Sequence, residues 1–203
     1  ERTLREEFFA PFETAVREGG IGTVMASYNE INGVPSHINR WLLKDLLRGE
    51  WGFEGFVISD GWGVDDLYRL HFVAADEAAA AEKAFASGVD IELGRCFRHL
   101  EQAVEAGRIP LAALDAAVAK VLRVKFQLGL FENPFVNIEK AVSITNSAEH
   151  KALALEAAHK SIILLKNEGG LLPLDQSRLR SLAVIGPNAA SVRLGGYSGD
   201  PGC

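Results

Sequence analysis

Cysteine, long apolar runs and clustered basic residues are all scarce in this sequence of 203 residues. Its two cysteines, Cys96 and Cys203, are far apart and have no metal-type partner at short spacing, so we predict neither a disulfide framework nor a metal site. No stretch of about 18 apolar residues occurs, and the sequence therefore predicts no membrane-spanning helix. The net charge of −6, without a Lys/Arg cluster, argues against nucleic-acid binding.

The composition is that of a globular protein with a sizeable core, because 48% of the residues are hydrophobic. The first residues, "ERTLREEFFAPFE", are charged and have a helical pattern, without a basic-then-apolar secretory signature. Composition leaves the cellular compartment open, and it leaves the oligomeric state open as well, a homo-oligomer included.

Helical and apolar segments alternate along the chain. Short apolar runs predict strands at 23–27, 56–58 and 89–93, and helical spacing predicts the intervening helices, which begin near Leu4, Asn39, Glu77, Phe97 and Pro110. Strands separated by helices of about 10 residues or more indicate βαβ units and parallel pairing. Periodicity fits a (β/α) barrel and a doubly wound sheet equally well.

The composition shifts after "GLFENPFVN", where a loop rich in Asn, Ser and Thr precedes a predicted helix at 148–160. Two further apolar runs, 162–165 and 182–187, predict strands of a second α/β domain, so we place a boundary near residue 145. A complete eight-stranded barrel needs about 250 residues. We therefore expect the chain to be an internal piece of a longer protein, inactive and poorly soluble when expressed alone, because open parallel edges promote aggregation.

The most informative stretch is "GFVISDGWGVDDL", in which an apolar strand ends in a carboxylate, Asp60. Ligands of parallel α/β folds bind at the carboxyl ends of the strands. Asp60 would be held rigidly there, Trp62 offers a flat face on which a sugar ring can stack, and Tyr28 follows the neighbouring strand and could donate a hydrogen bond to keep Asp60 ionised. The alternative is a structural aspartate that closes an Asx-turn or caps the next helix.

A resemblance to a known family adds to this interpretation. The segment "VMASYNEINGVPSHINRWLLKDLLRGEWGFEGFVISD" closely resembles the part of glycoside hydrolase family 3 that ends in the catalytic nucleophile. Further similar segments keep the family's order and spacing along the chain: "HFVAADEAAAA", "GVDIEL", "AVEAGRI", "GLFENPFV", "SIILLKNEGGLLPL", "AVIGPNA" and "RLGGYSG".

The resemblance implies an α/β fold in which residues 1–145 are the C-terminal part of a (β/α)₈ TIM-type barrel with its last three strands. Residues 146–160 would be a linker helix, and 161–203 the beginning of an α/β sandwich domain. It also implies a retaining, exo-acting β-glycosidase without a cofactor, acting on an oligosaccharide or β-glycoside. The nucleophile falls on Asp60, while Met25 and Tyr28 match positions that line the pocket for the terminal sugar. The acid/base glutamate is expected beyond residue 203.

One departure from the family pattern is the glycine after the nucleophile. The family usually has an aromatic residue there, whereas this chain has Gly61 and then Trp62. Trp62 could still stack on the leaving-group sugar. We expect a β-glucosidase; a β-xylosidase, or a non-catalytic carbohydrate-binding relative, are the alternatives. Asp60 oxygens tied up entirely in local backbone bonds would contradict the enzyme hypothesis.

Other polar residues receive simpler interpretations. The spacing of Asp65, Asp66 and Asp76 fits neither an EF-hand loop nor a site of two carboxylates and a histidine, so we predict solvated residues at helix starts. His71 follows a loop within the segment "HFVAAD" and is a candidate for the rim of the site. The remaining histidines are predicted to lie on the surface: His37, His99, His150 and His159.

Overall fold

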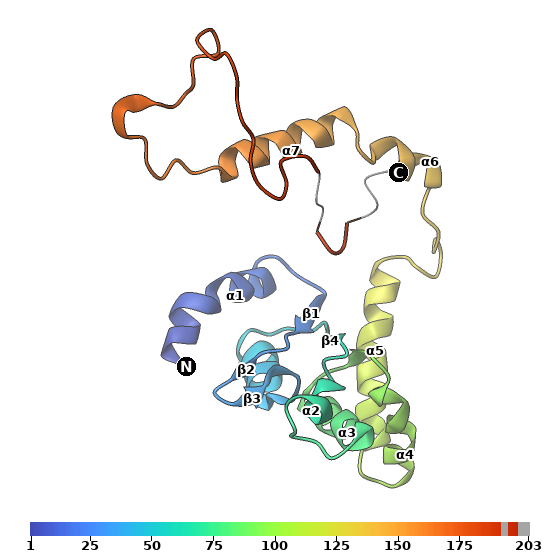
Figure 1. Cartoon of the computed structure of the whole chain (residues 1–203). Coiled ribbons are helices and arrows are strands. Elements are labelled where there is room, and N and C mark those ends of the chain that lie inside the picture. Colours follow the sequence, from blue (N-terminus) through green and yellow to red (C-terminus); the bar gives the residue numbers. More distant parts are fainter. Residues whose placement is uncertain (192–194, 199–203) are drawn as a thin grey trace. The chain divides into compact units, whose positions relative to one another are not determined.

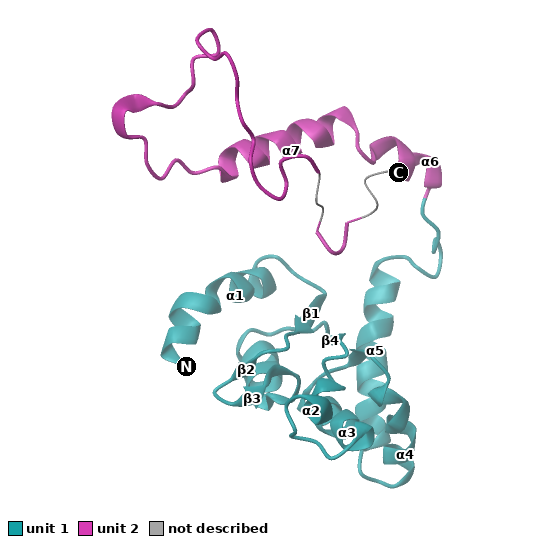
Figure 2. Cartoon of the chain, in the orientation of Figure 1, with its two compact units in different colours: residues 1–136 teal, residues 137–203 magenta. Residues whose placement is uncertain are grey.

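The computed structural model describes residues 1–191 and 195–198, and it divides into two compact units, 1–136 and 137–203 (Figure 2). The division lies nine residues before 145, where the sequence predicts a boundary. Cys203, for which we predict no partner, lies outside the described residues. In the described part of the chain, no helix is both long enough and apolar enough to cross a membrane.

The first unit is an α/β structure built around a parallel sheet (Figure 1). Segments of 3-10 or π-helix, which the figure does not label, are numbered η1, η2 and so on. Its elements, in chain order, are η1 Leu4–Phe8, α1 Ala10–Arg17, β1 Thr23–Ala26, β2 Glu30–Ile31, β3 Val34–Pro35, η2 Ser36–Ile38, η3 Trp41–Glu50, β4 Phe56–Gly61, α2 Asp66–Arg69, α3 Glu77–Ser87, β5 Ile91–Leu93, η4 Cys96–His99, α4 Leu100–Glu105 and α5 Leu111–Gln127.

The three predicted strands and their parallel pairing are confirmed. The sheet has the order β1-β4-β5, with Met25 opposite Ile58 and Ile58 opposite Ile91. β4 is longer than the sequence predicts and extends to Gly61, so Asp60 lies inside the end of the strand. Parallel strands require crossover connections, and η3 and α3 supply them between β1, β4 and β5.

Capping residues define the starts of both crossover helices and the end of α3. The Asn39 side chain accepts the backbone N–H of Leu42 at the start of η3, and Asp76 accepts that of Ala79 at the start of α3. Gly88 ends α3 at a φ of 116°, a conformation that favours glycine. Asp76 therefore stands at a helix start, as predicted.

One face of the sheet is buried under the helices, and the other face is more open. Val57 and Ser59 of β4 are fully buried, whereas Ile58 and Asp60, which alternate with them, are only half-buried. The buried face meets leucines of η3 and alanines of α3, chiefly Leu43, Leu46, Leu47, Ala80, Ala81 and Ala84. Because Met25 is paired with Ile58, it shares the open face with Asp60.

A buried ionic cluster lies at the opposite end of the strands from Asp60. The Asp90 carboxylate receives Arg48 and Lys120, each at 2.6 Å, and it also accepts the backbone N–H of Val57 at 2.8 Å. Its side chain is 4% exposed. These contacts tie η3, α5 and the start of β4 to the segment that leads into β5, and so fix the relative placement of the sheet and its helices.

The second unit contains α6 Ile138–Ile144, α7 Ala148–Ser161 and the short η5 Glu168–Gly170. The helix predicted at 148–160 is therefore confirmed. The strands predicted at 162–165 and 182–187 are wrong, because both segments have irregular backbone. An apolar run becomes a strand only when another backbone segment pairs with it, and no described residue pairs with either run.

Candidate active site

The end of β4 is shaped by a bulge that keeps Asp60 and Trp62 close to β5. The register shifts between Ile58 and Gly61, and two unusual hydrogen bonds maintain the pairing. The Ser59 hydroxyl accepts the N–H of Leu93 at 2.8 Å, and the Trp62 N–H donates to the Leu93 carbonyl at 2.7 Å. Trp62 then turns the chain at a φ of 62°, a value uncommon for a residue with a side chain.

The Asp60 carboxylate is half-buried and partly restrained by the local backbone. Its Oδ1 accepts the N–H of Gly61 at 2.7 Å. Within the described residues, no hydrogen bond reaches Oδ2. The Asp60 carbonyl accepts the N–H of Gly63 at 3.1 Å, which closes the turn. Oδ1 is therefore engaged by a local backbone bond, which is what a purely structural aspartate in a turn would show. Oδ2 is available for an external partner.

Tyr28 and Met25 come from the neighbouring strand β1 and the residues that follow it. The Tyr28 hydroxyl donates to the carbonyl oxygen of Gly61 at 2.5 Å, so this bond goes to the backbone beside Asp60. Met25 lies on the open face of the sheet and also lines a cavity of about 640 Å³ between β1 and the N-terminal helices. Both side chains are about half exposed, at 45% and 55%.

His37 is the residue of this region that the sequence prediction missed. It was predicted on the surface, but it is 1% exposed, and its Nε2 accepts the backbone N–H of Asp60 at 3.3 Å. Burial lowers the pKa of His37 to about 4, while the charge of Asp60 acts in the opposite direction. The ring rests against Gly63, where a Cβ atom would lie 2.3 Å from Cε1. Gly63, three residues after the strand-end Asp60, was the available signal, because a side chain there would occupy the place of the ring.

The loop that follows β1 contains a tight hairpin. Asn32 and Gly33 have φ angles of 52° and 76° and turn β2 into the antiparallel β3, which delivers His37 to the rear of the Asp60 turn. His71 contacts this hairpin, since its Nδ1 lies 2.8 Å from a Glu30 carboxylate oxygen. The structure therefore places His71 beside the loop that follows β1.

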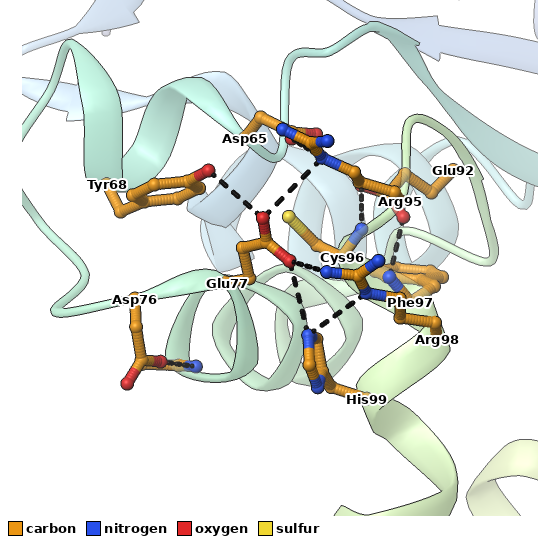
Figure 3. Close-up of polar contacts among 11 residues, drawn as sticks. Asp65, Tyr68, Asp76, Glu77, Glu92, Arg95, Cys96, Phe97, Arg98 and His99 are labelled. Atoms are coloured by element: carbon orange, nitrogen blue, oxygen red, sulfur yellow. Dashed lines mark hydrogen bonds and ion pairs between the residues drawn. The ribbon is translucent and has the colours of Figure 1, made fainter.

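Trp62 is 52% exposed, and the guanidinium of Arg95 lies over its ring at 5.6 Å. Arg95 is itself held by two carboxylates, with its Nε 3.6 Å from Asp65 and 3.5 Å from Glu77 (Figure 3). Glu77 also receives Arg98 and His99, and these partners, His99 foremost, lower its pKa. A network formed by Asp65 at the start of α2 and by residues of α3 and η4 thus orients the cation that covers Trp62.

Asp65 was predicted to be solvated, and this prediction is wrong because its side chain is fully buried. The turn at Trp62 directs it inward, toward Glu92 and Cys96, and the ligand atoms of the three residues lie within 4.8 Å of one another. Arg95 already supplies a cation to Asp65, although neither oxygen of this buried carboxylate accepts a hydrogen bond from the described residues. Glu92 accepts the N–H groups of Cys96 and Phe97, and burial raises the pKa values of both Glu92 and Cys96.

Comparison with known protein families identifies the family of this chain. Residues 1–124 match the N-terminal domain of glycosyl hydrolase family 3, and residues 162–203 match the C-terminal domain of the same family. The chain belongs to glycosyl hydrolase family 3. The resemblance found from the sequence motifs is therefore confirmed, and the strand end that carries Asp60 lies within the first match.

Individual relatives agree with this assignment. A β-xylosidase from Formosa agariphila is 43% identical over 99% of this chain, and a periplasmic β-glucosidase from Salmonella typhimurium is 36% identical over 94%. The solved structure of a β-glucosidase from Erythrobacter marinus has a TM-score of 0.87 and 46% identity over 94% of this chain. The chain spans 30%, 25% and 25% of these three proteins, respectively.

Proposed function

We propose that this chain is the nucleophile-bearing part of a retaining β-glycosidase and that Asp60 is the nucleophile. The proposal depends on one observation, the position of the Asp60 side chain and the hydrogen bonding of its two carboxylate oxygens. Asp60 stands at the carboxyl end of a parallel strand, on the open face of the sheet, with Oδ1 held by Gly61 and no hydrogen bond to Oδ2 from the described residues. Active sites of parallel α/β enzymes form at such strand ends.

The proposed reaction proceeds in two displacements. In the first, the Asp60 Oδ2 attacks the anomeric carbon of a terminal β-linked sugar, and the bond to the leaving oxygen breaks while an acid gives that oxygen a proton. In the second, water attacks the same carbon, loses a proton to the conjugate base and releases the carboxylate. The acid/base group must lie about 5–5.5 Å from Asp60. We assign no residue of this chain to it and expect a glutamate from another segment.

The proposed architecture is the end of a (β/α)₈ barrel in residues 1–145, a linker helix at 146–160 and the start of a sandwich domain in 161–203. The half-open sheet supports the barrel. The face that carries Met25, Ile58 and Asp60 lacks the helical cover of the other face, and in a closed barrel this face points into the interior. A structure of the full-length protein that showed these residues outside a barrel would contradict this assignment.

The sugar specificity is proposed as β-glucoside, with β-xyloside as the alternative, because relatives with both names are comparably similar to this chain. Met25 and Tyr28 are proposed to line the site of the terminal sugar, and Trp62 to stack on the leaving-group sugar. Initial rates of the full-length protein with 4-nitrophenyl β-glucoside and β-xyloside measure the preference directly. A kcat/KM that favours the xyloside would reverse it.

The deciding experiment separates an enzyme from a non-catalytic carbohydrate-binding relative. The full-length protein is incubated with 2-deoxy-2-fluoro β-glucosyl and β-xylosyl fluorides, which trap a glycosyl-enzyme ester, and the labelled peptide is identified by mass spectrometry. We expect the label on Asp60, none in Asp60→Asn, and normal labelling in the matched control Asp66→Asn. A label on another residue, or no label with either sugar, would refute the proposal.

A further inference from the structure

The residue after Asp60 creates a positioning problem, because glycine restricts the backbone least of all residues. Gly61 carries no side chain that could pack against the sheet, and the register of the β4–β5 pair is already shifted between Ile58 and Gly61. The only restraint on the carboxylate from its own segment is the N–H of Gly61. A nucleophile needs a fixed direction of attack, so an external restraint is required.

His37 supplies such a restraint from outside the strand. It stands in η2, behind the turn, and its Nε2 accepts the Asp60 N–H at 3.3 Å. An imidazole nitrogen that accepts a hydrogen bond carries no proton, so the ring must be neutral, with its proton on Nδ1. Burial, which keeps the pKa of His37 low, maintains this form at neutral pH even though the Asp60 carboxylate is near.

The ring is also fixed by shape. A Cβ at position 63 would lie 2.3 Å from Cε1 and 2.4 Å from Nε2, so only glycine leaves room for the imidazole. On another side lies the ring of Tyr28, whose centroid is 6.4 Å from that of His37. Because the Tyr28 hydroxyl binds the Gly61 carbonyl, two side chains hold the backbone on either side of the Asp60–Gly61 peptide bond.

We propose that His37 is a positioning residue for Asp60, which acts through the backbone N–H to fix the direction in which the free carboxylate oxygen is presented to the sugar. This inference rests on the proposed function, since it assumes that Asp60 is the nucleophile. His37 does not contact the reacting atoms. Its contribution is to restrain a backbone segment that Gly61 would otherwise leave mobile.

The test uses the full-length protein and measures the rate of trapping by the 2-deoxy-2-fluoro glycosyl fluoride. His37→Leu removes the acceptor at similar volume, and His37→Gln retains an acceptor oxygen. We expect His37→Leu to slow trapping by about 10- to 100-fold, the range that a misplacement of about 1 Å can produce, and His37→Gln to recover most of the rate. Affinity for gluconolactone, a reversible sugar-like inhibitor, should change by less than about threefold, because the sugar pocket remains in place.

A purely structural role is distinguished by a matched control. Val89 is also buried, and Val89→Ala removes packing far from the Asp60 turn. It should lower stability without slowing the trapping step. If His37→Leu is not recovered as folded protein, Gly63→Ala decides, because its Cβ must displace the ring from the Asp60 N–H while the histidine is retained; slow trapping is again expected.

The outcomes separate this inference from the proposed function. Wild-type protein that is trapped on Asp60, together with a His37→Leu variant trapped equally fast, overturns the positioning role alone. Equal slowing in Val89→Ala and His37→Leu also overturns it, since general destabilisation would then account for the effect. Wild-type protein that is never trapped refutes the proposed function, and the positioning role falls with it.

Discussion

The hydroxyl of Tyr28 donates a 2.5 Å hydrogen bond to the carbonyl oxygen of Gly61, one residue beyond Asp60. This bond crosses from the end of β1 to the end of β4 and joins the two strand ends at which the sequence predicts the site. It also positions a phenol beside the place where a glycosyl ester would form. The sequence predicts that Tyr28 donates a hydrogen bond to Asp60 itself. The observed bond instead restrains the backbone of the next residue, Gly61.

Removing the Tyr28 hydroxyl should therefore affect turnover more than folding. We expect Tyr28→Phe to lower kcat of the full-length protein by about fivefold, because the lost bond frees the Gly61 peptide and a hydrogen bond of this kind contributes about 1 kcal/mol. The matched control is Tyr68→Phe, which removes a hydroxyl that binds Glu77 at 3.4 Å. Steady-state kinetics with an aryl glycoside check both variants. Equal kcat values in Tyr28→Phe and the wild type would contradict this role.

Arg95 should influence the leaving-group sugar through Trp62. In Arg95→Ala the cation over the indole ring is lost, so we expect KM for a disaccharide to rise by about three- to tenfold, in line with a cation–π contact of about 1 kcal/mol. An aryl glycoside, whose leaving group is not a sugar, should be less affected.

Arg98→Ala is the control for this prediction. Arg98 pairs with the same Glu77 at 2.6 Å, but no contact with the Trp62 ring is found for it. Disaccharide and aryl-glycoside kinetics are measured for both arginine variants. Identical KM changes in the two would show that the shared carboxylate network, rather than the contact with Trp62, is responsible.

The sequence predicted the sheet well because its strands are local apolar runs bounded by capping residues. Asn39 and Asp76 stand at helix starts that the sequence predicts, and in the structure each side chain caps its helix. The runs at 162–165 and 182–187 had the same local pattern but failed as strands, because pairing depends on segments that a local pattern cannot specify. Strand formation is a property of two backbone segments, and periodicity reports on only one of them.

The polar residues were harder to predict for a related reason. Asp60 could be selected because strand-end carboxylates have a recognised place in parallel folds. The burial of His37 and Asp65 depends on turns with unusual backbone, at Asn32–Gly33 and at Trp62, which redirect the following residues inward. A sequence pattern assigns polar residues to the surface by default. Only the three-dimensional path of these loops shows otherwise.

Asp90 is predicted to be a stability residue rather than a functional one. It is buried with two cations and a backbone N–H, so Asp90→Asn leaves Arg48 and Lys120 without their counter-charge. We expect a loss of about 3–5 kcal/mol in the free energy of unfolding, as is typical for a broken buried ion pair. Urea unfolding of the full-length protein measures it, with the exposed Asp45→Asn as control. A loss no larger than that of the control would contradict the prediction.

His37 should also leave a signature in the pH dependence of stability. Burial lowers its pKa to about 4 from an ordinary value of 6.5; the nearby Asp60 charge opposes this shift, and His71 adds to it. Between these two pH values the unfolded chain binds a proton that the folded chain does not. The contribution of the neutral His37 ring to the free energy of unfolding is therefore complete above pH 6.5. It is lost as the pH falls toward 4, by about 3 kcal/mol in all.

The measurement compares wild-type protein and His37→Gln by urea unfolding at several pH values between 4 and 7.5. The wild type should lose stability more steeply than the variant as the pH falls, because glutamine does not titrate. Both proteins share every other titrating group, so the difference between their curves reports the titration of His37 together with its coupling to Asp60 and His71. Parallel curves would mean that His37 binds its proton equally well in the folded and unfolded states, so that its pKa is not lowered. Below pH 6.5 its Nε2 would then be protonated and could not accept the N–H of Asp60.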